Sequence, residues 1–155
     1  MIARIAAPVL TAVALVALPG AALADTCAPA SAPRPTATVE AMYAAAMAGD
    51  KAAMAATLAP DFYAFDGGRR YSASEFVGFI DLLKAMKTTM AWTVTAPDEK
   101  IVCDVAWVTW DNRGSATDPT GTRKIEWLES AIERWQDGAW RLVFFHSTQV
   151  PPPGK

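Results

Sequence analysis

The stretch that decides the fold is Glu133–Thr148, ERWQDGAWRLVFFHST, near the end of the 155-residue chain. It contains two apolar, aromatic-rich runs on either side of Asp137-Gly138, a pair typical of the tight turn between antiparallel strands. The stretch therefore predicts a closing β-hairpin. It also contains His146, the single histidine of the chain, and the direction of this imidazole depends on the register of the hairpin.

Two turn lengths are open for this hairpin, and they predict different neighbours for His146. A three-residue loop at 136–138 with a glycine bulge places Leu128 opposite His146, whereas a two-residue turn places Glu129 there. We favour the three-residue loop because it groups apolar residues on one face and pairs opposite charges on the other. Strand alternation then predicts an inward face with five polar members: Glu126, Ser130, Arg134, His146 and Thr148.

Three further runs upstream of the hairpin are rich in β-branched and aromatic residues. They are WTVTA (92–96), IVCDVAWVTW (101–110) and TRKIEWLESAIERW (122–135), with breaks at PDEK (97–100) and DNRGSATDPTG (111–121). Consecutive strands with short connections predict an antiparallel meander that ends before PPPGK.

Helices are predicted before this sheet. Thr38 is placed to cap a first helix that Gly49 ends, and Asp50 is placed to cap a second helix that ends before Pro60. DFYAFD (61–66) and the following glycines predict a short strand and a turn. The capping-box spacing of Ser72–Glu75 opens the main helix, with an apolar stripe at Phe76, Phe79, Ile80, Leu83, Met86 and Met90. Helices followed by one long sheet indicate an α+β fold.

The first 24 residues have the three parts of a secretory signal: Arg4, an apolar run from Ile5 to Leu18, and the small-x-small end Ala22-Leu23-Ala24. The apolar run is shorter than a membrane-spanning helix needs. We therefore expect cleavage before Asp25, export, and no membrane association of the mature chain. The predicted organisation is a signal peptide at 1–24, a Pro/Ala-rich tail at 25–37, one domain at 38–150 and a tail at 151–155.

Charge and cysteine content narrow the function classes further. The 14 basic and 16 acidic residues, less Arg4, leave the mature chain with a net charge of −3, and no basic cluster indicates nucleic-acid binding. Export places Cys27 and Cys103 where a disulfide can persist, and a buried free thiol at Cys103 is the alternative. Two cysteines and one distant histidine do not make a metal site.

The order of these motifs resembles the nuclear transport factor 2-like superfamily, in particular its SnoaL-like branch with ketosteroid isomerase and polyketide cyclases as relatives. The matching pieces are AMYAAAMAGDKAAMAATLAPDF (41–62), DVAWVTW (104–110) and the closing hairpin. The resemblance covers Val39–Val150. It implies a cone-shaped fold in which a strongly bent antiparallel sheet wraps a long helix, with a pocket at the open end.

The resemblance also implies candidate site residues. Asp66 aligns with the carboxylate that moves a proton in ketosteroid isomerase-like sequences, and His146 lies where a pocket histidine recurs in the SnoaL-like branch. Either residue is a candidate general base, with a turn residue (Asp66) and a hydrogen-bonded wall residue (His146) as the structural alternatives. The isomerases' oxyanion tyrosine matches Met42, one position from Tyr43, and their second acid aligns with Ser130 or Ala131. Candidate ligand-binding residues are Tyr43, Tyr63, Trp92, Glu126, Ser130, Arg134 and Thr148.

The favoured function is that of an exported protein, expected in the bacterial periplasm, that binds a small apolar organic molecule without a cofactor. One alternative is a cofactor-independent isomerase, lyase or cyclase that uses Asp66 or His146 as a base, with Tyr43 or Arg134 stabilising negative charge. The other is a non-catalytic association module. Trp107, Trp127 and Trp135 are candidates for an outer sheet face through which two copies pair.

Overall fold

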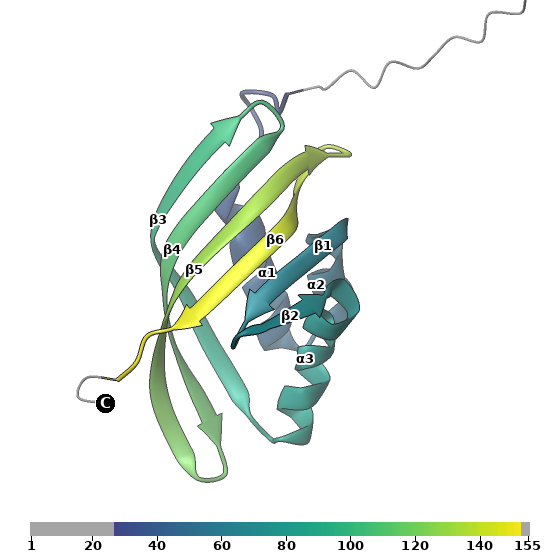
Figure 1. Cartoon of the computed structure of the whole chain (residues 1–155). Helices are drawn as coiled ribbons and strands as arrows, with labels where there is room; N and C mark the ends of the chain where they lie inside the picture. The colour runs from purple at the N-terminus through teal and green to yellow at the C-terminus, as the bar shows by residue number, and fades with distance from the viewer. Residues whose placement is uncertain (1–26, 153–155) are drawn as a thin grey trace, which may run out of the picture.

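The computed structural model describes residues 27–152, so the predicted signal peptide lies outside the described residues (Figure 1). Two helices come first, α1 (Thr36–Ala48) and α2 (Lys51–Ala56). Gly49 has a φ of 70° and ends α1 in the left-handed conformation that glycine tolerates best. The Asp50 carboxylate caps α2 by accepting a backbone N–H bond of 2.9 Å. The predicted helix pair is confirmed, although α1 begins before Thr38, which therefore does not cap it.

The main helix, α3 (Ala73–Ala85), begins at the predicted capping box. The Ser72 side chain accepts from the backbone of Glu75, and the Glu75 side chain accepts in return from the Ser72 backbone. The helix is shorter than its apolar stripe predicted, because Lys87 has a φ of 52° that an α-helix cannot contain. Met90 consequently lies in the next strand rather than on the helix.

Six strands form one sheet in the order β2-β1-β6-β5-β4-β3. Their bounds are β1 Leu58–Asp66, β2 Arg69–Ser72, β3 Thr89–Val102, β4 Val105–Asp118, β5 Gly121–Gln136 and β6 Ala139–Gln149. The predicted meander is confirmed for β3 to β6, and the α+β fold with it. The sheet is mixed rather than fully antiparallel, because β1 pairs parallel to β6.

The sheet bends around the helices, which all lie on its concave side (Figure 1). Side chains from both layers are fully buried between them, and the largest apolar ones are Val39, Met42, Ile80, Val108 and Leu142. None of the helices within 27–152 lies on the opposite, outer face. Its exposed apolar side chains include Phe65, Trp107, Leu128 and Ile132. None of the helices in the described chain has the length and apolar character needed to cross a bilayer.

Two predicted breaks lie inside strands. The PDEK segment is part of β3, where a bulge at Ala96 with a φ of 49° absorbs the irregularity. The reversal of the chain comes later, at Cys103-Asp104. β4 likewise continues through most of the predicted 111–121 loop and stops at Asp118. Long-range pairing has overridden the local turn signals in both places.

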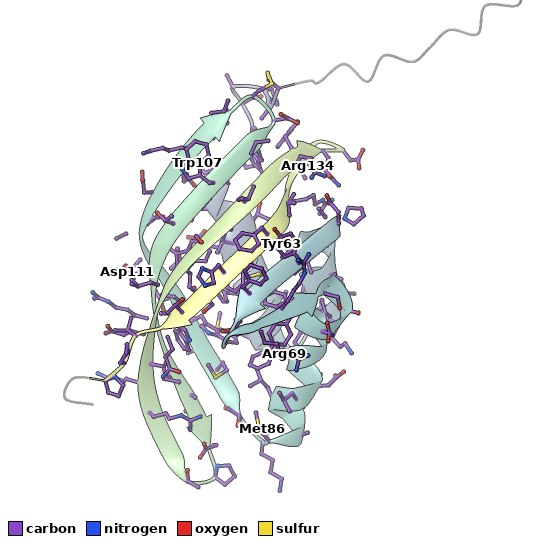
Figure 2. All side chains as sticks on the ribbon, viewed as in Figure 1. Tyr63, Arg69, Met86, Trp107, Asp111 and Arg134 are labelled. Atoms are coloured by element: carbon purple, nitrogen blue, oxygen red, sulfur yellow. A yellow bond between two sulfur atoms is a disulfide. The ribbon has the colours of Figure 1, made fainter. Side chains whose placement is uncertain are left out.

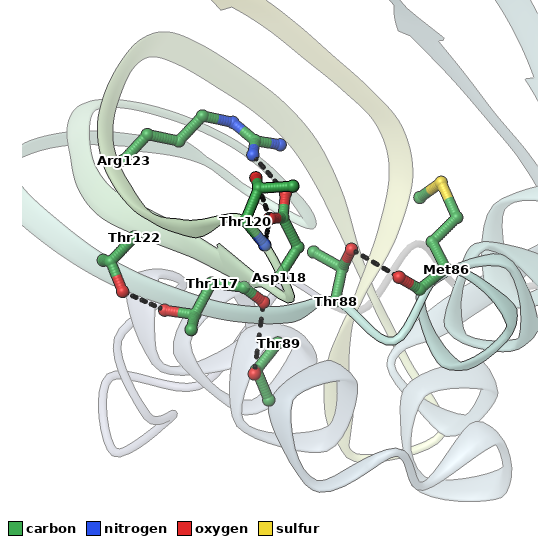
Figure 3. Close-up of polar contacts among 8 residues, drawn as sticks. All are labelled: Met86, Thr88, Thr89, Thr117, Asp118, Thr120, Thr122 and Arg123. Atoms are coloured by element: carbon green, nitrogen blue, oxygen red, sulfur yellow. Dashed lines mark hydrogen bonds and ion pairs between the residues drawn. The ribbon is translucent and has the colours of Figure 1, made fainter.

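The β4–β5 turn is held by the carboxylate of Asp118 (Figure 3). It accepts from the Thr120 hydroxyl at 2.5 Å, from the guanidinium of Arg123 at 2.6 Å and from the backbone N–H of Thr120 at 2.8 Å. These bonds hold the pKa of Asp118 at about 2, below its usual value. The hydroxyls of Thr117 and Thr122 lie 2.9 Å apart across the same hairpin. The turn therefore occupies only residues 119–120.

The closing hairpin differs from both registers that the sequence left open. Its turn has two residues, Asp137-Gly138, with φ values of 52° and 76°. The register then shifts between Ile132 and Glu133, because β6 contains the extra residue Val143. Ser130 therefore lies opposite His146, and Glu129 lies opposite Ser147. One bulge residue has reversed the expected alternation in the last half of β6.

The predicted disulfide between Cys27 and Cys103 is confirmed. It joins the start of the described chain to the β3–β4 turn, and the backbone N–H of Ala28 donates to the carbonyl of Cys103 at 3.0 Å. The segment before α1 is attached further along by Trp140, whose indole N–H donates to the Pro33 carbonyl at 3.0 Å. The predicted tail is thus packed against the domain over its described part.

Candidate functional site

A cavity of about 450 Å³ lies between the helices and the concave side of the sheet. Its volume is within the range of small-molecule sites in proteins, about 300–1,000 Å³. The walls are mostly apolar and aromatic. The lining residues are Met42, Tyr43, Ala46, Met54, Asp66, Arg69, Tyr71, Glu75, Phe76, Gly78, Phe79, Leu82, Met90, Trp92, Trp127, Glu129, Phe145 and Ser147.

The buried end of the cavity is built around the carboxylate of Glu129. This carboxylate accepts from the Tyr43 hydroxyl at 2.5 Å, the Asn112 amide at 2.8 Å and the Ser147 hydroxyl at 2.8 Å. The amide of Asn112 is oriented by Thr93, whose backbone N–H donates to the Asn112 side-chain oxygen at 3.1 Å. Four strands and one helix therefore meet in a single buried network.

The network determines where the protons at this end of the cavity point. Burial raises the pKa of Tyr43 well above its usual value, and the negative charge of Glu129 raises it further, so the phenol keeps its proton. Burial also raises the pKa of Glu129, while the three donors oppose that change. A carboxylate that accepts three bonds is hydrogen-bonded as an anion. The hydroxyl protons of Tyr43 and Ser147 are thus directed away from the cavity space.

Asp66 lines the same cavity from the end of β1. Its strand alternates so that Phe62, Ala64 and Asp66 face inward and Phe65 faces outward. Burial raises the pKa of Asp66, and a hydrogen bond from the backbone of Gly67 opposes the change. Its carboxyl group forms no salt bridge among the described residues, although the charge of His146 also lowers its pKa. It is therefore available to a ligand.

The mouth of the cavity carries an ion pair. The guanidinium of Arg69 lies 3.0 Å from the Glu75 carboxylate and 4.5 Å from the centre of the Tyr71 ring (Figure 2). The Arg69 side chain is 60% exposed, so this pair belongs to the rim. The positive charge is shared with Glu75 and does not compensate the carboxylates deeper in the cavity.

The structure brings three of the predicted site residues together. Asp66, Tyr43 and Trp92 line the cavity, and the rings of Tyr43 and Trp92 lie 5.3 Å apart. The predicted orientation of the other six is wrong because of the Val143 bulge and the strand registers: none of them lines this cavity, and they lie on the outer side of the sheet. They are Tyr63, Glu126, Ser130, Arg134, His146 and Thr148.

The six outer residues have other neighbours. The imidazole of His146 is exposed, and the Thr148 hydroxyl lies 3.3 Å from its Nε2. Arg134 forms an ion pair of 2.9 Å with Asp61. The Arg70 guanidinium lies 4.0 Å from the ring centre of Tyr63. Of these six residues, Tyr63 and Arg134 are labelled in Figure 2.

Sequence reasoning missed Glu129, Asn112, Ser147 and Trp127. Asp-Gly between apolar runs is a strong signal for a two-residue turn. That signal would have predicted the correct strand pairing next to the turn, up to the bulge. The bulge at Val143 has no comparable signal. Trp127 lines the cavity, and Trp135 packs on Trp140 with ring centres 5.4 Å apart, so of the three tryptophans expected on the outer face only Trp107 is exposed there. No group of three metal-ligating side chains occurs within 27–152.

Comparison with known proteins agrees with this architecture. The profile of the SnoaL-like domain matches residues 36–152. The chain belongs to the SnoaL-like family. Within the wider fold, it resembles a protein of the NTF2-like family from Streptomyces avermitilis, with a TM-score of 0.66 and 15% identity over 76% of this chain and 94% of that one.

Two other solved structures are similar to this chain in fold. A ketosteroid isomerase-like protein from Erwinia carotovora atroseptica has a TM-score of 0.62 and 18% identity, covering 76% of this chain and 94% of its own. The CamKII hub homology domain of Chlamydamonas reinhardtii has a TM-score of 0.65 and 19% identity, covering 75% and 95%. These identities establish the fold alone. A search of curated protein sequences finds no match.

Proposed function

We propose that this SnoaL-like domain binds a small, largely apolar organic molecule in the cavity between α3 and the concave side of the sheet. The observation that carries the proposal is the cavity itself, about 450 Å³ with mainly apolar and aromatic walls and a few polar groups. Such a combination is typical of small-molecule sites, where apolar walls supply affinity and a few polar groups orient the ligand.

Filling the cavity tests this function. Gly78 lies on the cavity side of α3, and a Cβ built on it meets no atom within 4 Å. Gly78→Phe is therefore expected to place a ring in the cavity without disturbing the helix, and to weaken binding of the uncharged dye Nile red at least about tenfold. The measurement is a fluorescence titration of the mature protein.

Gly78→Ala is the matched control for this experiment. It makes the same backbone change, adds only a methyl group and favours the helix slightly, so it should bind the dye like the wild type. Saturable dye binding that Gly78→Phe leaves intact, or no dye binding to the wild type, would contradict the proposed function.

Proton transfer by Asp66 is the second candidate function. A half-buried carboxyl with a raised pKa facing an apolar cavity supports it, because such groups serve as bases next to carbonyls. We rank it below binding because the hydroxyl protons of Tyr43 and Ser147 are committed to Glu129. Neither of these two hydroxyls is then free to stabilise an oxyanion beside Asp66, and such stabilisation is usually the largest catalytic term.

Oligomeric association through the outer sheet face is compatible with ligand binding. Leu128 is 58% exposed there and Ile132 and Trp107 are each 42% exposed, which makes an apolar surface without a covering helix. The similarity to a hub homology domain supports association. We propose a homodimer in which this surface of one copy packs on the same surface of the other.

Leu128→Arg is expected to convert the dimer to a monomer, because a buried unpaired guanidinium is costly in an apolar interface. The measurement is the molar mass by light scattering during gel filtration. Met47→Arg is the control, since Met47 is also an exposed apolar residue, 44% accessible, but lies on α1. Equal masses for the wild type and Leu128→Arg would exclude this interface.

We also propose that the protein is exported, with the periplasm as its compartment. The disulfide supports this proposal, because such bonds persist mainly in oxidising compartments.

A further inference from the structure

We propose that the cavity selects organic cations, that is, amines or quaternary ammonium compounds with an apolar body. The inference rests on the proposed binding function and adds the chemical class of the ligand. Three independent features of the cavity support it: the balance of charges, the direction of the hydroxyl protons, and the aromatic walls.

The charges that line the cavity are mainly negative. Asp66, Glu75 and Glu129 contribute carboxyl groups, and Arg69 contributes the only basic side chain of the lining. Arg69 is paired with Glu75 at the exposed rim. Asp66 is half-buried and forms no salt bridge within 27–152, where His146 is the one charge that lowers its pKa from beyond salt-bridge distance, so a ligand cation in the cavity would supply a direct counter-charge.

The hydrogen-bonding groups at the buried end are acceptors. Tyr43 and Ser147 both donate their hydroxyl protons to Glu129, so what they present to a ligand is oxygen lone pairs. A ligand carbonyl or carboxylate would meet these oxygens without a donor. An ammonium group supplies up to three donors and suits such a surface.

Aromatic rings surround the same space. Tyr43, Trp92, Trp127, Tyr71, Phe76 and Phe145 all line the cavity. The face of an aromatic ring attracts a cation, by about 2 kcal/mol when the site is desolvated, and tryptophan is the strongest of the three aromatic side chains in this respect. Two tryptophans and two tyrosines beside an unpaired carboxyl group therefore form the combination by which proteins recognise alkylated ammonium ions.

A series of ligands with one shared body tests the selectivity. Displacement of Nile red from the mature protein is measured with 4-phenylbutylamine, its N,N,N-trimethyl analogue, 4-phenylbutan-1-ol and 4-phenylbutanoate. The two cations are expected to bind about tenfold or more tightly than the alcohol, and the carboxylate more weakly than the alcohol. Asp66→Asn should lower the ratio of cation affinity to alcohol affinity at least about fivefold.

Asp98→Asn is the matched control, because it removes the same charge from an exposed aspartate of β3 that does not line the cavity. It should retain the full preference for cations. Displacement by the alcohol as strong as by the amine, or a preference for the carboxylate, would overturn the inference while leaving the binding function intact. Failure of the wild type to bind Nile red at all would instead overturn the binding function on which the inference rests.

Discussion

Glu133→Gln is expected to make the protein more stable than the wild type above pH 8, by several kcal/mol and by about 5 kcal/mol at most. The Glu133 side chain is fully buried on β5, between β4 and β6. Within the described residues its oxygens form no hydrogen bond of acceptable geometry, although the Thr38 hydroxyl lies close enough to act on them. Burial raises its pKa from 4.5 to about 8, the Thr38 hydroxyl opposes this change, and the negative charge of Glu99 adds to it.

The sign of the effect follows from the two protonation states. Between pH 4.5 and about 8 the folded protein holds the Glu133 proton and the unfolded chain does not, so the unfolded state binds fewer protons. The contribution to stability therefore falls as the pH rises through this window, by about 1.4 kcal/mol per pH unit. Below pH 4.5 Glu133 is protonated in both the folded and the unfolded state, so it no longer lowers the free energy of unfolding. Glutamine cannot ionise and has nearly the shape of the protonated acid, so the variant loses this pH dependence.

The measurement is the free energy of unfolding by urea at several pH values from 4 to 9. Glu126→Gln is the control, because Glu126 is an exposed carboxylate on the neighbouring stretch of the same strand. Only the difference between each variant and the wild type is interpreted, since other groups titrate in both. A constant difference between Glu133→Gln and the wild type across the range would show that Glu133 does not titrate in this way.

Removal of the disulfide is expected to have the second large effect. The bond between Cys27 and Cys103 closes a long loop, because the two cysteines are separated by 76 positions in the sequence, and the loop-entropy model assigns such a cross-link about 4 kcal/mol. The double variant Cys27→Ser and Cys103→Ser should therefore unfold at a temperature about 10–15 °C lower than the oxidised wild type. The measurement is thermal unfolding followed by circular dichroism.

Reductant provides the control for this variant. Dithiothreitol should lower the unfolding temperature of the wild type toward that of the double variant and leave the double variant unchanged. The remaining attachments of the N-terminal segment, the Trp140–Pro33 hydrogen bond and the Arg34–Glu99 ion pair, stay available in the variant. An unfolding temperature within about 2 °C of the oxidised wild type would contradict a stabilising role for the bond.

The sequence by itself determined the parts of this protein that depend on local chemistry. Gly49 ends α1, Asp50 caps α2, and Ser72 and Glu75 begin α3, because each of these side chains acts on backbone groups within a few residues. The order of the elements was enough for the α+β fold and the SnoaL-like resemblance. The two cysteines left a single possible pairing.

Only the tertiary structure decided which polar groups enter the cavity. Strand side chains alternate with a period of two, so the single extra residue at Val143 exchanges the faces of everything after it in β6. His146 is placed outside by that exchange, and Ser147 is placed inside beside Glu129. The bulge depends on how β6 pairs with β5 and packs on the helices along its whole length. No short stretch of sequence contains those contacts.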